Sequence, residues 1–186
     1  MNEAAALFVG ALFGTISTIL VNHLSQERAA LERNKERKFE KLERRRLLRI
    51  EKLEELLTGF REWSRTELGA FLLVSEVRDG SINIEEYMRT MNETYAEAKS
   101  ELHRTFTLAK SYGGKATNAL DDAFEAHERA KRETNGIMTL LRYSPDCVTD
   151  DSVNEFYLVV GEFESMLPAA EQAVAAEIRS LAMLEE

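Results

Sequence analysis

The chain has 186 residues, of which 31% are charged, and its formal net charge is −9 at pH 7. It contains 2 prolines and 1 cysteine. The single cysteine excludes an intramolecular disulfide and fits a reducing compartment. Runs of alternating β-branched residues are absent, which together with the few prolines favours an all-α fold.

The first predicted element is an uncharged stretch near the N-terminus. Residues 4–22 read AAALFVGALFGTISTILVN and carry no ionisable side chain. As a helix this stretch is ~28 Å long at ~1.5 Å per residue, close to the ~30 Å hydrocarbon core of a bilayer. We predict a transmembrane anchor over residues 1–24, with the lipid bilayer as a partner. A cleaved signal peptide and a soluble core helix are the alternatives; a signal peptide needs a basic start, which Met1–Glu3 does not provide.

A row of small and polar residues runs along the predicted anchor at four-residue spacing. Its members are Ala6, Gly10, Gly14, Thr18 and Asn22. Gly10 and Gly14 form a GxxxG pattern, which allows two membrane helices to approach closely. We therefore predict membrane-helix association through this row, and hence a homo-oligomer. The alternative is that Gly and Ala are simply frequent in membrane helices.

Basic residues follow the uncharged stretch. Between Ser25 and Lys52 there are eleven Lys or Arg and six acidic residues, whereas no Lys or Arg precedes the stretch. Because an excess of Lys and Arg marks the cytoplasmic side, a single-pass protein with its N-terminus outside and its C-terminal domain in the cytoplasm is expected. The expected location is the plasma membrane, specifically a bacterial inner membrane.

Residues 25–46 predict a charged juxtamembrane helix. They are good helix formers without Gly or Pro. Three oppositely charged pairs lie at helical-neighbour spacing: Glu32 with Lys35, Glu40 with Arg44, and Glu43 with Arg46. Each such pair stabilises an exposed helix by about 0.2–0.5 kcal/mol. The sparse apolar residues do not sustain a heptad seam, and a GxxxG crossing would splay the helices that follow it, so no long coiled coil is predicted.

Residues 47–186 predict a cytoplasmic helical bundle. Apolar residues recur there at spacings of three and four, which is typical of amphipathic helices. The expected segments run from Leu47 to a stop at Asp79–Ser81, from a cap at Asn83 to a stop at Gly113–Gly114, from about Lys115 to Arg142, and from about Asp151 to Leu184. The short turns between them predict an antiparallel four-helix bundle, and Pro168 predicts a kink in the last helix.

The first bundle helix has the richest apolar face. Its expected core residues are Ile50, Leu53, Leu57, Phe60, Trp63, Leu68, Phe71, Leu72, Val74 and Val77. Trp63 is interpreted as core filling, with a hinge anchor as the alternative. From Leu53 onward the chain has thirteen basic and twenty-six acidic residues. This acidic balance argues against nucleic acid as a partner, because phosphate contacts need clustered Lys and Arg.

No recognisable catalytic or metal-binding pattern accompanies these helices. The three histidines lack a Glu three residues earlier, so the di-metal pattern of helical bundles is not supported. An acidic cluster beside His127 is interpreted as a solvated face, with His127 turned partly inward and a cation site as the alternative. Its members are Asp121, Asp122, Glu125 and Glu128. No catalytic residue, cofactor or metal is predicted, and the protein is not expected to be an enzyme.

Three hypotheses for function remain. The first is a membrane-anchored helical bundle that acts through an unidentified protein partner as scaffold, sensor or adaptor, and that self-associates. The second is a membrane-acting effector or channel-forming subunit gated by the bundle, in which Thr15, Ser17, Thr18 and Asn22 line a pore. The third is a small-ligand-binding or enzymatic bundle, which requires a polar pocket with converging ionisable groups.

Overall fold

The computed structural model describes the backbone of residues 3–183 and the side chains of residues 21–94 and 100–183. Four α helices are described: α1 Glu3–Arg78, α2 Ile84–Tyr112, α3 Thr117–Tyr143 and α4 Asp150–Ala182. Two short 3-10 helices connect them, η1 Gly114–Ala116 and η2 Pro145–Cys147. The predicted all-α fold is therefore confirmed. The chain divides into two compact units, Met1–Leu47 and Leu48–Glu186.

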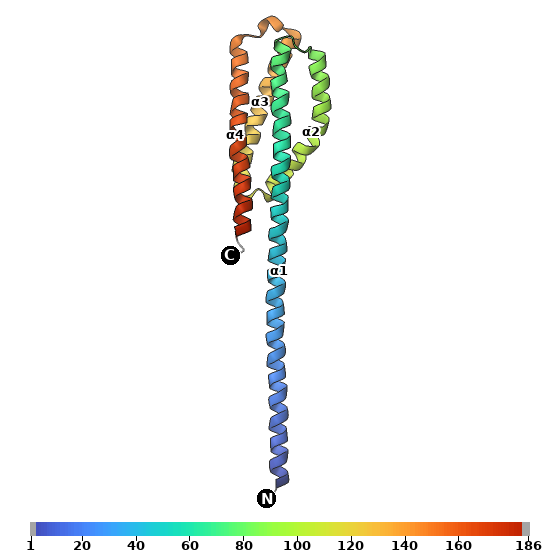
Figure 1. The fold of residues 1–186 in the computed structure, drawn as a ribbon, viewed down its shortest axis with the longest axis vertical. Helices are drawn as coiled ribbons and strands as arrows, with labels where there is room; N and C mark the ends of the chain where they lie inside the picture. The colour runs from blue at the N-terminus through green and yellow to red at the C-terminus, as the bar shows by residue number, and fades with distance from the viewer. Residues whose placement is uncertain (1–2, 184–186) are drawn as a thin grey trace. The chain divides into compact units, whose positions relative to one another are not determined.

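The second unit is a helical bundle. Its part of α1 and the helices α2, α3 and α4 alternate in direction, and α3 packs along α4 (Figure 1). Three ion pairs join α1 to α4: Arg49 to Glu177 at 2.6 Å, Arg61 to Glu171 at 2.7 Å, and Arg78 to Asp150 at 3.0 Å. Residue numbers rise along α1 as they fall along α4, so these pairs record an antiparallel register. The Arg61 and Arg78 pairs are exposed, and such pairs contribute only about 0–1 kcal/mol each, so they mark this register more than they stabilise the fold. Glu177 of the third pair is buried.

Local sequence signals set the helix ends. At the end of α1, Ser81 N donates to Glu76 O at 2.9 Å and Gly80 N donates to Val77 O at 3.1 Å. This is a Schellman motif, and the φ of +75° at Gly80 explains the glycine. At the start of α2, Asn83 accepts a hydrogen bond from Glu86 N at 2.8 Å. The predicted stop at Gly80 and cap at Asn83 are thus confirmed.

The connection between α2 and α3 is longer than predicted. Lys115 belongs to η1, and α3 begins at Thr117 rather than at about Lys115. Gly114 has a φ of +57°, and a Cβ added there would lie 2.7 Å from Glu177 Oε1. The left-handed backbone conformation therefore favours glycine at this position.

The core of the bundle is organised around Trp63 of α1. Its indole centroid lies 5.6 Å from Phe60, 5.2 Å from Phe124, 4.8 Å from His127 and 5.8 Å from Phe163. These rings come from α1, α3 and α4, so one side chain contacts three helices. Trp63 is buried, as the core-filling interpretation predicted.

One predicted core position on α1 is wrong. Leu72 is 59% exposed, whereas the unpredicted Leu56 is fully buried. Adjacent helical residues point about 100° apart, and Phe71 already occupies the inward direction. Leu72 therefore faces solvent. In α4 the helix continues through Pro168, which lies on its exposed side.

The first unit lies within α1, and side chains 21–42 are exposed. The Glu43–Arg46 pair predicted there is formed at 2.8 Å. Only residues 21–24 of the predicted anchor have described side chains, so most of that prediction lies outside the described side chains. Among the described residues, no helix is long and apolar enough to cross a membrane.

Candidate functional site

The bundle contains a buried pair of ionisable side chains. Glu67 of α1 and His127 of α3 place Oε2 and Nε2 3.0 Å apart, and each side chain is 2% exposed. The two atoms are at ion-pair distance, although His127 Nε2 has no hydrogen-bond partner in the described part of the chain. Desolvating a charge costs several kcal/mol, so each member of such a pair depends on the other.

Aromatic rings enclose the imidazole of His127. Its centroid lies 4.8 Å from Trp63, 5.9 Å from Phe71 and 5.5 Å from Phe163. These rings keep water away from the imidazole on the α1 and α4 sides. The pair therefore lies in a low-dielectric environment, in which its electrostatic interaction is stronger than at the surface.

The carboxylate of Glu67 also acts electrostatically on Tyr87 of α2. Burial raises the pKa of Tyr87 to about 12, and the negative charge of Glu67 adds to this increase. The phenol therefore stays neutral across the physiological range. Through Tyr87, Glu67 and His127, the buried polar site draws on α2, α1 and α3.

A cavity between α2 and α3 reaches this site. It has a volume of about 400 Å³ and is lined by Leu102, His103, Phe106, Phe124, His127 and Glu128. On its α3 side, His127 Nδ1 lies 3.6 Å from Glu128 Oε1. Ligand pockets have volumes of about 300–1,000 Å³, so the cavity is large enough for a small molecule or an apolar side chain.

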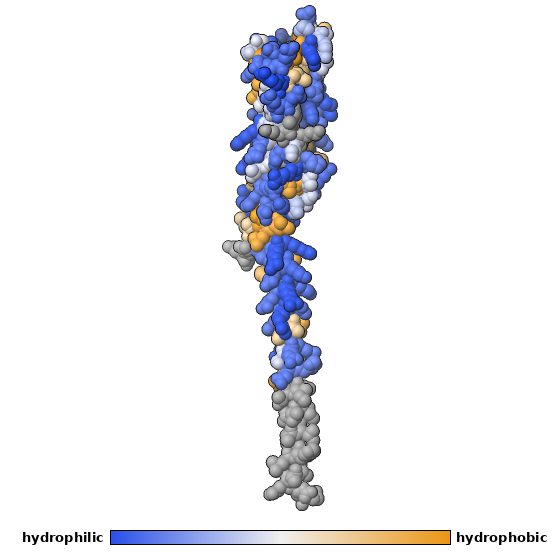
Figure 2. Space-filling view, turned by 90° about the vertical axis from the view of Figure 1, so that its right-hand side faces the viewer, coloured by the Kyte–Doolittle hydropathy of each residue, from blue (hydrophilic) through white to orange (hydrophobic). Residues whose placement is uncertain are grey.

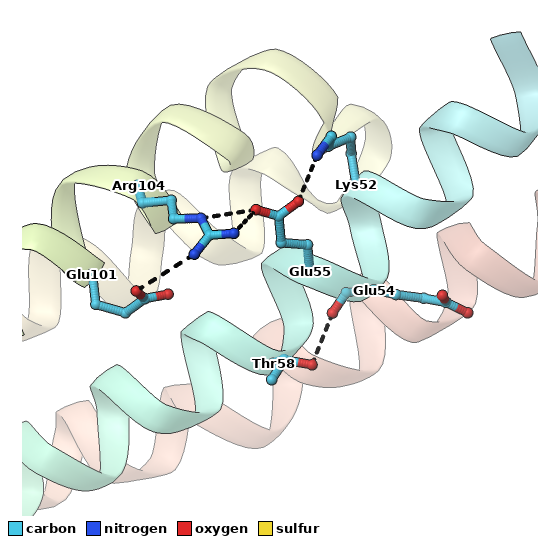
Figure 3. Close-up of polar contacts among 6 residues, drawn as sticks. All are labelled: Lys52, Glu54, Glu55, Thr58, Glu101 and Arg104. Carbon is cyan, nitrogen blue, oxygen red and sulfur yellow. Dashed lines mark hydrogen bonds and ion pairs between the residues drawn. The ribbon is translucent and has the colours of Figure 1, made fainter.

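A second polar cluster joins α1 to α2. Figure 3 shows Glu55 of α1 between Lys52 of the same helix and Arg104 of α2. Glu55 accepts from Lys52 Nζ at 2.7 Å and from Arg104 Nε at 2.8 Å. These two contacts lower the pKa of Glu55 below its ordinary 4.5, and they raise the pKa of Lys52 and of Arg104. Nearby, Gly59 permits a close approach, because an added Cβ would lie 2.7 Å from Glu101 Oε1.

The predicted association row is largely outside the described side chains. The side chains of Ala6, Gly10, Gly14 and Thr18 lie outside the described side chains, and the side chain of Asn22 is exposed on α1. Association through this row therefore stays a prediction.

The acidic cluster on α3 is split in the structure. Its four carboxylates on Asp121, Asp122, Glu125 and Glu128 are exposed, as predicted for a solvated face. His127 is fully buried rather than turned partly inward, because it faces Glu67 on α1. Among the described residues, no group of three or more His, Cys, Asp or Glu side chains could hold a metal ion.

Sequence reasoning missed Glu67 as a site residue. Glu67 lies four residues after Trp63 and four before Phe71, which places it on the buried face of α1. The signal in the sequence was an ionisable residue on the apolar face of α1. Its partner lies on another helix, which spacing along one chain does not reveal.

The arrangement is suited to ligand binding. The cavity gives a small molecule access to His127, which lies at ion-pair distance from Glu67. No protein-family model, no curated protein and no solved structure matches this chain. The function is therefore inferred from the chemistry of these residues.

The buried pair predicts strong energetic coupling. Glu67→Leu should lower the free energy of unfolding by about 3–5 kcal/mol, because it leaves His127 in the core without its charged partner. Combining it with His127→Leu should recover most of this loss, since packed apolar side chains need no partner. Denaturant unfolding followed by the fluorescence of Trp63, the only tryptophan, measures both. Additive losses in the double variant would contradict the coupling.

The Glu55 cluster predicts a pH-dependent contribution to stability. A carboxyl group whose pKa is lowered by folding stabilises the protein above its ordinary pKa and loses this effect as the pH falls through the folded-state pKa. Glu55→Gln should therefore be less stable than wild type at pH 7, and this difference should disappear as the pH falls below about 4.5. The matched control is Glu54→Gln, because Glu54 is exposed and only its backbone carbonyl accepts, from Thr58. Equal pH profiles for the two variants would refute this prediction.

Proposed function

We propose that this chain is a single-pass membrane-anchored helical-bundle protein that acts through protein–protein interaction and self-associates. The observation that carries the proposal is the uncharged stretch Ala4–Asn22, followed by eleven Lys or Arg between Ser25 and Lys52. An uncharged segment of this length matches the hydrocarbon core, and the cations on one side give it a direction. The N-terminus then lies outside and the bundle lies in the cytoplasm.

The charge of the bundle favours one kind of partner. From Leu53 onward the chain has a net charge of −13, from thirteen basic and twenty-six acidic residues. A surface of one sign attracts and orients partners of the opposite sign. The unidentified partner is therefore a protein with a basic surface patch, and nucleic acid is disfavoured.

Among scaffold, sensor and adaptor, the interior of the bundle favours a sensor. The cavity between α2 and α3 reaches His127, which is paired with Glu67 in the core. A ligand that enters the cavity meets a side chain on which the packing of α1 against α3 depends. Binding there is thus coupled to the stability of the bundle.

Self-association is assigned to the row Ala6, Gly10, Gly14, Thr18 and Asn22. Without a hydrophobic driving force inside the bilayer, helices associate where small residues allow close van der Waals packing. The two glycines at four-residue spacing provide this contact on one helix face.

Enlarging the glycines tests the proposed association. Gly10→Ile combined with Gly14→Ile should convert the oligomer to a monomer in detergent, because branched side chains keep the backbones apart. The matched control, Ala11→Ile with Thr15→Ile, has the same spacing on another part of the helix and should leave the oligomer intact. Sedimentation velocity in detergent measures the mass. An unchanged oligomer in the glycine variant would contradict the proposal.

A further inference from the structure

The first unit exposes an apolar stripe along α1. Leu24, Leu31, Phe39 and Leu42 are 46%, 60%, 70% and 65% exposed. At about 100° per residue, these four side chains fall within an arc of about 80° on the helix. Figure 2 shows apolar patches interrupting the mainly hydrophilic surface of this part of α1. The stripe is narrow, as is a seam for one neighbouring helix.

Within the stripe, Leu31 and Leu42 are eleven residues apart, whereas Leu24 and Leu31 are seven apart. Leucines stand at positions 20, 31, 42 and 53, and Phe39 is followed by Ile50 at the same interval. Eleven residues make about three helical turns, and a sustained repeat of this length gives a right-handed supercoil. This period explains why no heptad seam is found in a segment that still carries an apolar row.

The same row is a packing row elsewhere in the chain. Leu53 is fully buried in the second unit, where the other helices of the bundle surround it. In the first unit, α1 is the only described element. A second molecule is a source of the neighbouring helix on which Leu31 and Leu42 can pack.

We propose that residues 24–42 of two copies pair in parallel along this row as a right-handed coiled coil. The inference rests on the proposed membrane-anchored, self-associating function. Anchoring makes the two helices parallel and concentrates them next to one another. A second copy also carries the same eleven-residue period, which keeps both rows in contact along the whole segment.

The hand of the supercoil agrees with that of the membrane contact. GxxxG pairs cross with a right-handed geometry, which is opposite to a heptad coiled coil. An eleven-residue repeat has the same hand as the GxxxG crossing. The two proposed contacts therefore have the same hand.

Charges on the two edges of the stripe support a parallel pair. Lys38 lies on one edge and Glu43 on the other, five residues further along. In a parallel two-fold pair, edge residues at this separation face each other across the seam. Each Lys38 therefore faces Glu43 of the second copy.

Arg28 and Lys35 lie on the same face as the stripe. In the pair, each cation comes close to its counterpart, which weakens association at low ionic strength. Added salt screens this repulsion and also the attraction between Lys38 and Glu43, since the Debye length falls from ~10 Å at 0.1 M to ~3 Å at 1 M.

Disulfide cross-linking of the full-length protein in detergent tests the pairing. In a Cys147→Ser background, which removes the exposed native cysteine, Leu31→Cys and Leu42→Cys are compared with Arg33→Cys and Arg44→Cys. Both pairs are eleven residues apart, but the arginines lie on the opposite face of α1. The leucine positions should cross-link about tenfold faster or more, because a disulfide requires Cα atoms within ~7 Å.

The outcomes separate this inference from the proposed function. If the protein is oligomeric but leucine and arginine positions cross-link at equal rates, the row does not pair and only the membrane contact stands. If the protein with its native Gly10 and Gly14 is already monomeric, both the self-association and the pairing are overturned. Fast cross-linking that is confined to the leucine positions and lost in the Gly10→Ile, Gly14→Ile background supports both.

Discussion

The bundle depends on the contacts that one face of α1 makes with the other helices. Trp63 packs against rings from α1, α3 and α4, and Leu53, Leu56 and Phe60 continue the same buried face. Burying each large apolar side chain contributes about 1.5–3 kcal/mol, which exceeds the contribution of any exposed ion pair. The three ion pairs between α1 and α4 are therefore secondary to this packing. The cavity between α2 and α3 lies next to it.

A buried charge pair within this packing has a different consequence. Well-packed apolar residues often stabilise a core as well as an ion pair does, so Glu67 and His127 are not explained by stability alone. The pair lies beside the cavity, through which a ligand can reach His127. The charge of Glu67 also contributes to the raised pKa of Tyr87 on α2. Three helices thus meet at one polar site, which is the arrangement expected of a bundle whose packing responds to a bound ligand.

Periodicity in the sequence predicted the helices and most core positions, because spacing along one chain records which side chains share a face. Local signals such as Asn83 and Gly80 predicted helix ends, because capping contacts form between residues that are close in the sequence. Pairing across helices is not recorded in this way, so the Glu67–His127 contact and the cavity were missed. Leu72 was misplaced because the apolar run Phe71–Val74 contains more apolar residues than one face can bury. The candidate association row remains a prediction from sequence, since only Asn22 among its members has a described side chain.

Alkaline carbonate extraction tests the central claim, membrane anchoring through Ala4–Asn22, most directly. The full-length chain is compared with a chain lacking residues 1–24. The account predicts that the full chain stays in the membrane pellet, whereas the shortened chain is released and remains helical by circular dichroism. Complete extraction of the full chain would contradict it. Residues 4–22 would then form a packing helix, and lipid contacts would not hold the protein in the membrane.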